Sequence, residues 1–156
     1  MAGFTSNAVK LTLLVICLAV VPFAGVLAAS DGKLVAADPA GVAIKGYDTV
    51  AYFTERKAIK GKPEFAHSWH DAQWLFANAR HREIFASDPE RYAPQFGGFC
   101  SNGLSKGKVV AADPEQWTIV DGKLYIKFSR AARDNWRQDK AVKIMKAKEN
   151  WADYQK

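Results

Sequence analysis

Two alternating apolar segments around Asp121-Gly122 restrict the fold more than any other feature of the sequence. Residues 117–120 precede the Asp-Gly pair and residues 123–128 follow it. An Asp-Gly pair between two such segments is typical of a type I′ turn, because both central residues need a positive φ. The sequence therefore predicts a β-hairpin. Its register pairs apolar side chains on one face, Ile119 with Leu124 and Trp117 with Ile126, and leaves Lys123, Tyr125 and Lys127 on the other.

A second hairpin is predicted around His70-Asp71. Aromatic or imidazole side chains alternate with smaller residues over 65–69, and the apolar segment 72–76 follows the turn. A two-residue turn places His67 opposite Trp74 and Phe65 opposite Phe76 on one face. His67 would then point into an aromatic core, whereas His70 would lie at an exposed tip.

Capping signals predict short helices next to the hairpins. Asn78 can cap a helix that runs to about residue 87, presents Ile84 and Phe85 inward and carries His81. Asp88-Pro89 and Asp113-Pro114 each place a capping residue before a proline at the first helical position, so both pairs predict a helix start.

A long basic helix is predicted at the C-terminal end of the chain. Ser129 is its expected cap, and the helix extends to about residue 154. Apolar residues recur along this segment with the period of an amphipathic helix, which predicts that the helix docks onto the domain through one apolar face. The expected anchors are Trp136, Val142, Met145 and Trp151.

The first 29 residues have the three parts of a secretory signal peptide. Lys10 is a short basic flank, the apolar run starts at Leu11, and small residues precede Ser30. An uncleaved membrane anchor is the alternative, since the apolar stretch is nearly long enough to span a bilayer. Pro22 and Gly25 favour cleavage. We therefore expect a periplasmic or secreted protein with no stable membrane span after cleavage, and a loose lead-in over residues 30–45 before the domain of residues 46–156.

The charge of the chain does not indicate nucleic-acid binding. The leader carries one lysine and no acidic residue, so its removal lowers the formal charge from +6 to +5. A basic excess can favour nucleic acid, but no basic patch interleaved with aromatic residues supports that partner here. An envelope protein or a metal ion is the expected partner.

Cysteine content is the most informative feature of the composition. The chain has two cysteines, and Cys17 lies in the leader, so the mature protein keeps only Cys100. An exported protein with one cysteine cannot form an internal disulfide, so this thiol is free, bound, or paired between molecules. Inert packing in the core is the alternative. Gly97 and Gly98 precede Cys100 and would give backbone support and room for a partner.

Several segments together resemble the YHS domain family, in its exported single-domain branch. They cover nearly all of the mature chain in one order: GYDTVAYF at 46–53, AHSW at 66–69, WLFA at 74–77, FASDPERYAPQFGGFC at 85–100 and WTIVDGKLY at 117–125. The resemblance implies an α+β fold, a small treble-clef-like domain with two β-hairpins, short helices and a long C-terminal helix. It also implies a role in sensing or handling metal ions.

The cysteines of the metal-associated YHS members are not present at the matching positions. Those members open with a Cys-x-Met motif and carry two further cysteines, one after the second strand and one on the following helix. Here the opening segment 46–53 has no cysteine, Ala77 stands at the position after the strand, and His81 stands at the position on the helix. In the exported branch the position associated with chemistry is the residue that follows a Gly-Gly-aromatic sequence. In this chain that residue is Cys100. The resemblance implies that some relatives carry selenocysteine there, which favours a chemical role.

Three functions remain open from the sequence. The first is transition-metal binding by Cys100 with His67 or His81, a donor set that suits copper or zinc. The second is thiol-redox chemistry at Cys100 alone, and the third is a structural or interaction module without a small ligand. A Cys–His pair would need an orienting group such as Asp48 or Asn102. No nucleophile elbow, phosphate loop or paired-carboxylate site is recognisable, so the sequence favours a binding domain over an enzyme.

Overall fold

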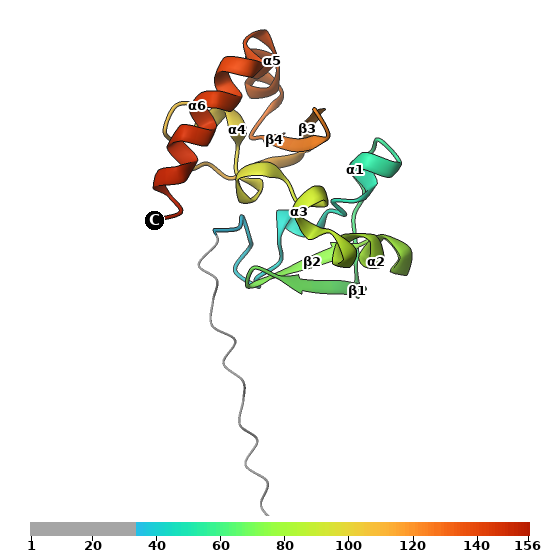
Figure 1. The fold of residues 1–156 in the computed structure, drawn as a ribbon. Coiled ribbons are helices and arrows are strands. Elements are labelled where there is room, and N and C mark those ends of the chain that lie inside the picture. Colours follow the sequence, from blue (N-terminus) through green and yellow to red (C-terminus); the bar gives the residue numbers. More distant parts are fainter. Residues whose placement is uncertain (1–33) are drawn as a thin grey trace, which may run out of the picture.

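The computed structural model describes residues 34–156, and the predicted leader lies outside this range. Figure 1 shows a mixed α+β fold with the β1–β2 hairpin at one end and the β3–β4 hairpin with α4, α5 and α6 at the other. No helix of the described range is long and apolar enough to cross a membrane. In chain order the elements are η1 (Ile44–Gly46), α1 (Ala51–Thr54), β1 (Lys62–Trp69), β2 (Ala72–Phe76), α2 (Ala79–Ser87), α3 (Pro89–Tyr92), η2 (Gln95–Gly98), α4 (Ser101–Leu104), β3 (Asp113–Val120), β4 (Lys123–Lys127), α5 (Arg130–Gln138) and α6 (Lys140–Asp153).

The β3–β4 hairpin confirms the prediction made from its turn. Asp121 and Gly122 form the two-residue connection with φ values of 49° and 71°. The strands pair in the predicted register, Ile119 with Leu124 and Trp117 with Ile126. The turn type and the apolar alternation therefore agree, as expected when both specify one register.

The β1–β2 hairpin confirms one predicted pair and corrects another. His67 lies opposite Trp74, and the positive φ values of His70 and Asp71 identify the predicted turn. The pairing of Phe65 with Phe76 is wrong, because the register shifts between residues 62 and 66 and places Lys62 opposite Phe76. An irregularity of this kind inserts extra residues into one strand and moves every later pair.

His70 is not the exposed turn residue that the sequence predicts. Its side chain is only 11% exposed and lies 3.8 Å from the Glu90 carboxylate. The imidazole packs on the Trp69 indole with ring centroids 3.7 Å apart. The turn itself is at the surface, but α3 and Trp69 cover the imidazole.

Two of the three predicted helix starts before the C-terminal region are confirmed. The Asn78 side chain accepts a hydrogen bond from the His81 backbone N–H at 2.9 Å and caps α2. Asp88 caps α3, with Pro89 in its first turn. The third prediction is wrong, because Asp113-Pro114 begins strand β3. Proline is also tolerated near the start of a strand, so the same dipeptide fits both structures.

The C-terminal region contains two helices where the sequence predicted one. Ser129 caps α5 as expected, but the chain leaves helical geometry at Asp139 (φ −132°, ψ 48°), and α6 is the long C-terminal helix. Trp136 is completely buried, as predicted. Val142 and Met145 are wrong as anchors, because they are 48% and 52% exposed.

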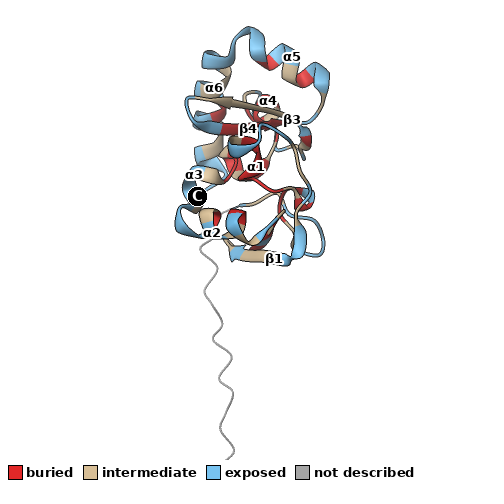
Figure 2. Cartoon of the chain, turned by 90° about the vertical axis from the view of Figure 1, so that its right-hand side faces the viewer, coloured by how far each residue is buried: buried red, intermediate tan, exposed pale blue. Residues whose placement is uncertain are grey.

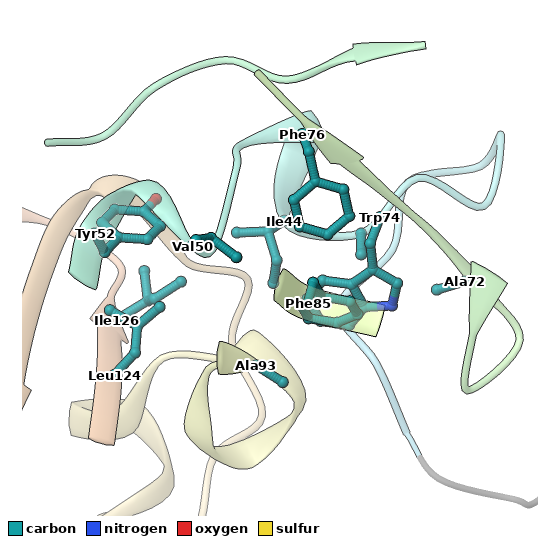
Figure 3. Packing of buried hydrophobic residues seen from close by; sticks show 11 residues of the cluster. Ile44, Val50, Tyr52, Ala72, Trp74, Phe76, Phe85, Ala93, Leu124 and Ile126 are labelled. Atoms are coloured by element: carbon teal, nitrogen blue, oxygen red, sulfur yellow. The ribbon is translucent and has the colours of Figure 1, made fainter. Parts of the chain in front are cut away.

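Strand β4 lies between two apolar clusters and is buried on both faces. Leu124 and Ile126 contribute to the larger cluster, which Figure 3 shows around Trp74 and Phe85. Tyr125 belongs to the second cluster, with Phe96, Leu104, Trp136 and Ala147. Figure 2 colours the chain by burial, with buried residues in red. The second face of the strand is thus an interior surface.

Residues 36–44, part of the predicted lead-in, pack against the domain. The Ala36 N–H donates to the Gly97 carbonyl oxygen at 2.8 Å, and the Ala43 N–H donates to that of Gln73 at 2.9 Å. Ala43 and Ile44 are almost completely buried. This segment therefore contributes to the core of the domain.

Candidate functional site

Cys100 is a buried free thiol that accepts two backbone hydrogen bonds. The residue is 2% exposed and is the N-cap of α4. Its Sγ atom accepts from the backbone N–H of Gly103 at 3.3 Å and of Phe128 at 3.2 Å. Two N–H donors stabilise negative charge on sulfur more than they stabilise a neutral thiol.

The local chain explains how these donors reach the sulfur. Ser101 follows Cys100, and its hydroxyl donates to the Ile126 carbonyl oxygen at 3.2 Å, which ties α4 to the end of β4. This contact places Phe128, just after β4, beside Cys100. A Cβ atom on Gly103 would lie 2.9 Å from the Lys108 carbonyl oxygen, so the turn after α4 requires glycine there.

Lys127, the last residue of β4, has a buried amine. The residue is completely buried, and its Nζ atom donates to the Tyr125 carbonyl oxygen at 3.1 Å. The amine lies 4.5 Å from the centre of the Trp136 ring. Burial lowers the pKa of Lys127 to about 7, and the positive charges of Arg137 and Arg133 act in the same direction.

Cys100 and Lys127 interact electrostatically. A negative charge on the Cys100 sulfur raises the pKa of Lys127 and so opposes the effect of burial. This is the smallest of the four influences on the Lys127 pKa.

A hollow of about 400 Å³ adjoins this site, and Cys100 forms part of its lining although the residue is only 2% exposed. Its walls come from α4 with the turn that follows it, the end of β4 and the start of α5. The lining residues are Cys100, Asn102, Gly103, Lys106, Lys108, Val110, Phe128, Ser129, Ala131, Ala132 and Asn135.

Gly97 and Gly98 face away from this hollow. A Cβ atom on Gly97 would collide with the Leu34 carbonyl oxygen, and one on Gly98 would collide with the Ile44 side chain. The two glycines therefore allow the segment before η1 to pack against η2. Backbone support for the thiol comes from Gly103 and Phe128 instead.

His81 belongs to a different buried group, centred on Asp48. The Asp48 carboxylate is completely buried, and its Oδ2 atom lies 2.7 Å from Nδ1 of His81. Backbone N–H groups of Val50, Ala51 and Ala77 also donate to this carboxylate, at 2.9, 3.2 and 2.8 Å. Because Asp48 accepts at every contact, Nδ1 of His81 is the donor and the imidazole is held in one orientation.

The other imidazole nitrogen of His81 faces a second hollow. Its Nε2 atom lies 3.4 Å from the Thr54 hydroxyl and 3.7 Å from a carboxylate oxygen of Glu55. Both residues line this hollow together with His81. Asp48 is thus the group that orients His81, and Cys100 has no part in this arrangement.

The structure does not bring Cys100, His67 and His81 together as one ligand set. His67 packs its ring edge-to-face on Phe85, with centroids 5.8 Å apart. Among residues 34–156, no three His, Cys, Asp or Glu side chains are arranged to hold a metal ion. Metal binding by Cys100 with one of these histidines therefore stays a prediction.

Lys127, Gly103 and Phe128 are the residues near the thiol that sequence reasoning missed. The hairpin register assigned Lys127 to the face opposite Leu124 and Ile126, but it gave no reason to bury that face. One signal was present in the sequence, because Lys127 follows Tyr125 by two residues and therefore shares its side of the strand.

No protein-family model, curated protein or solved structure matches this chain.

Proposed function

We propose that this chain is an exported domain that acts through nucleophilic thiol chemistry at Cys100. The observation that carries the proposal is the pair of backbone N–H donors, from Gly103 and Phe128, on the sulfur of a residue that lines a hollow. A thiolate, and not a thiol, is the attacking species in such chemistry. Both donors favour that form.

Lys127 supports the same function. Its pKa of about 7 means that the amine exchanges its proton near neutral pH. Once protonated, the amine interacts favourably with negative charge on the Cys100 sulfur. A buried amine that loses and regains its proton near neutral pH can therefore stabilise the Cys100 thiolate whenever the amine is protonated.

Thiol–disulfide exchange is the reaction that a single thiol of this kind performs. The Cys100 thiolate attacks one sulfur of a disulfide, a new S–S bond forms, the old one breaks, and the leaving sulfur departs as a thiolate. A thiol from a second molecule then attacks the mixed disulfide and regenerates Cys100. No second cysteine of the mature chain takes part, since Cys17 lies in the proposed leader.

Export places this reaction where disulfides persist. The leader of residues 1–29 is part of the proposal, as are the periplasmic or secreted location and the relation to the exported YHS branch. Mass spectrometry of envelope fractions should find a mature chain that begins near Ala29 or Ser30, as the small residues before Ser30 predict. Membrane-bound protein that retains residues 1–28 would contradict export by cleavage.

Alkylation of the folded mature chain tests the thiol directly. We expect iodoacetamide to modify Cys100 in native protein, and Lys127→Met to slow the reaction about fivefold at pH 7, as expected for an interaction of about 1 kcal/mol. Lys123→Met removes an exposed lysine of the same hairpin and should leave the rate unchanged. A thiol that reacts only after unfolding would contradict the proposal and favour the interaction module.

The same assay separates the thiol function from the metal function. Added Cu(I) or Zn(II) should leave the alkylation rate of Cys100 unchanged if the thiol acts alone. Protection by either metal, lost in His67→Ala or His81→Ala, would support metal binding by Cys100 and contradict the redox assignment.

A further inference from the structure

One face of the molecule combines exposed apolar side chains with lysines. It lies at the end formed by α4, α5 and α6 (Figure 1). Phe128, Val142 and Met145 are 57%, 48% and 52% exposed, the largest exposures of any large apolar side chain among residues 34–156. Met145 follows Val142 by three residues, so the two side chains are neighbours on α6. Single exposed apolar residues are ordinary, but several on one face indicate a contact surface. The basic face, as we call it, consists of Lys106, Lys108, Phe128, Val142, Lys143, Met145 and Lys146.

Two adjoining hollows make the basic face continuous. Lys106 lines both the hollow beside the thiol, which includes Phe128, and a second hollow, which includes Val142. Lys143 also lines the second hollow, and its ammonium group donates to the Asn135 amide oxygen at 2.9 Å. Asn135 in turn lines the first hollow. The residue after β4 and the start of α6 therefore belong to one surface.

Positive charge predominates on the basic face. Lys106, Lys108 and Lys146 are exposed, and Lys143 is a fourth cation. Among the residues that line the two hollows, Asp139 is the only acidic one. Within residues 34–156, none of the four lysines forms an ion pair with Asp or Glu. Their charges are therefore available to an anionic partner.

We propose that the basic face docks on the surface of a membrane that contains anionic phospholipids. The ammonium groups lie at the lipid phosphates, and the apolar side chains enter the layer between the headgroups and the acyl chains. A protein interface gathers its apolar groups in a core from which lysine is depleted. Here Lys106 lies between Phe128 and Val142, because it lines both hollows, and this arrangement favours lipid. Docking goes beyond the thiol chemistry and does not use Cys100.

Vesicle sedimentation tests the docking with the mature chain of residues 30–156. The protein is mixed with vesicles of equal parts phosphatidylglycerol and phosphatidylcholine, or with vesicles of phosphatidylcholine alone. We expect binding to the anionic vesicles only, because the lysines need the negative lipid charge. Equal binding to both vesicles, or binding to neither, would overturn the proposal.

Paired variants with the same loss of charge locate the binding surface. Lys106→Gln combined with Lys146→Gln should lower the partition coefficient about thirtyfold, roughly fivefold for each lysine. Lys57→Gln combined with Lys123→Gln removes two exposed lysines outside the basic face and should leave the partition coefficient almost unchanged. Equal losses in the two pairs would mean that the vesicles respond only to net charge, and docking through this face would be wrong.

Two single variants test the apolar and acidic positions. Phe128→Ser should lower the partition coefficient about tenfold, because the ring no longer enters the lipid. Glu149 follows Met145 by four residues on the same side of α6, so Glu149→Gln should strengthen binding by removing repulsion from the lipid. Unchanged binding of the Phe128 variant, or weaker binding of the Glu149 variant, would contradict the proposal. Circular dichroism verifies that every variant is folded.

Soluble polyglutamate separates a lipid surface from an acidic protein. Binding to polyglutamate that depends on the same two lysines, without binding to anionic vesicles, would overturn the lipid and favour an acidic protein partner. Cys100→Ser should bind vesicles as the wild type does, and the Phe128 variant should be alkylated at the wild-type rate, since its backbone N–H still reaches Cys100. Failure of docking would therefore leave the thiol function standing.

Discussion

The Nδ1 atom of His81 lies 2.7 Å from the Oδ2 atom of Asp48, and this carboxylate is completely buried. Asp48 precedes α1, His81 lies in the first turn of α2, and Ala77 at the end of β2 donates to the same oxygen. One carboxylate therefore joins the segment before α1 to the segment between β2 and α2, about 30 residues away. A buried acceptor with four donors contributes to stability chiefly because its removal leaves all four unpaired.

We predict that Asp48→Ala lowers the free energy of unfolding by about 3–5 kcal/mol, the range for removing one partner of a buried pair. Glu55→Gln is the matched control, since its carboxylate lies 3.7 Å from the same imidazole but is 44% exposed. We expect it to cost less than about 1 kcal/mol. Urea denaturation measures both, and equal losses would mean that the buried carboxylate has no special role.

We predict that the stability of the protein rises with pH between about 7 and about 10 because of Lys127. The folded state releases the Lys127 proton near pH 7, whereas an unfolded lysine keeps it to about pH 10. The unfolded state therefore binds more protons over this range, and stability increases as pH rises.

Lys127→Met isolates this effect from other titrating groups. The variant should be more stable than the wild type at pH 7, and the stability difference between the two should shrink by pH 10. Lys123→Met should follow the wild-type pH dependence. If the difference between wild type and Lys127→Met does not change with pH, the lysine titrates normally in the folded protein.

We predict that Gly122→Val costs about 1 kcal/mol or more, because Gly122 has a φ of 71° that valine resists. A Cβ atom there would have no neighbour within 4 Å, so the cost is conformational and not steric. The melting temperature should fall by a few degrees. Asp121→Asn should be tolerated, since asparagine also adopts positive φ, and an unchanged melting temperature for the valine variant would contradict the turn assignment.

We predict opposite sensitivities for two positions on α6. Ala147 is completely buried in the second cluster, so Ala147→Met should overpack it and cost about 1–3 kcal/mol. Met145 is 52% exposed, so Met145→Gln should change stability by less than about 0.5 kcal/mol. Thermal denaturation of both variants checks this, and a larger loss at Met145 would restore the anchor that the sequence predicted.

Features that depend on neighbouring residues were predictable from the sequence. The β3–β4 register follows from the turn at Asp121-Gly122 and the alternation on either side, and the start of α2 follows from the Asn78 cap. The same local reasoning failed at Asp113-Pro114, because a capping residue followed by proline also suits the start of a strand.

The candidate site required contacts between distant parts of the chain. The sequence identified Cys100 as a chemical candidate, yet one of its two donors comes from Phe128, 28 residues away. It identified His81 and Asp48 separately, but only the fold pairs them with each other and keeps His81 out of any ligand set with Cys100 and His67.

The sequence alone thus determined the turns, caps and alternation that act within a few residues, and it marked the thiol of Cys100. The tertiary structure decided that both faces of β4 are interior, and with them the burial of Lys127. The physical reason is that a strand pattern specifies two faces. Whether the second face meets water or protein depends on how α4, α5 and α6 pack.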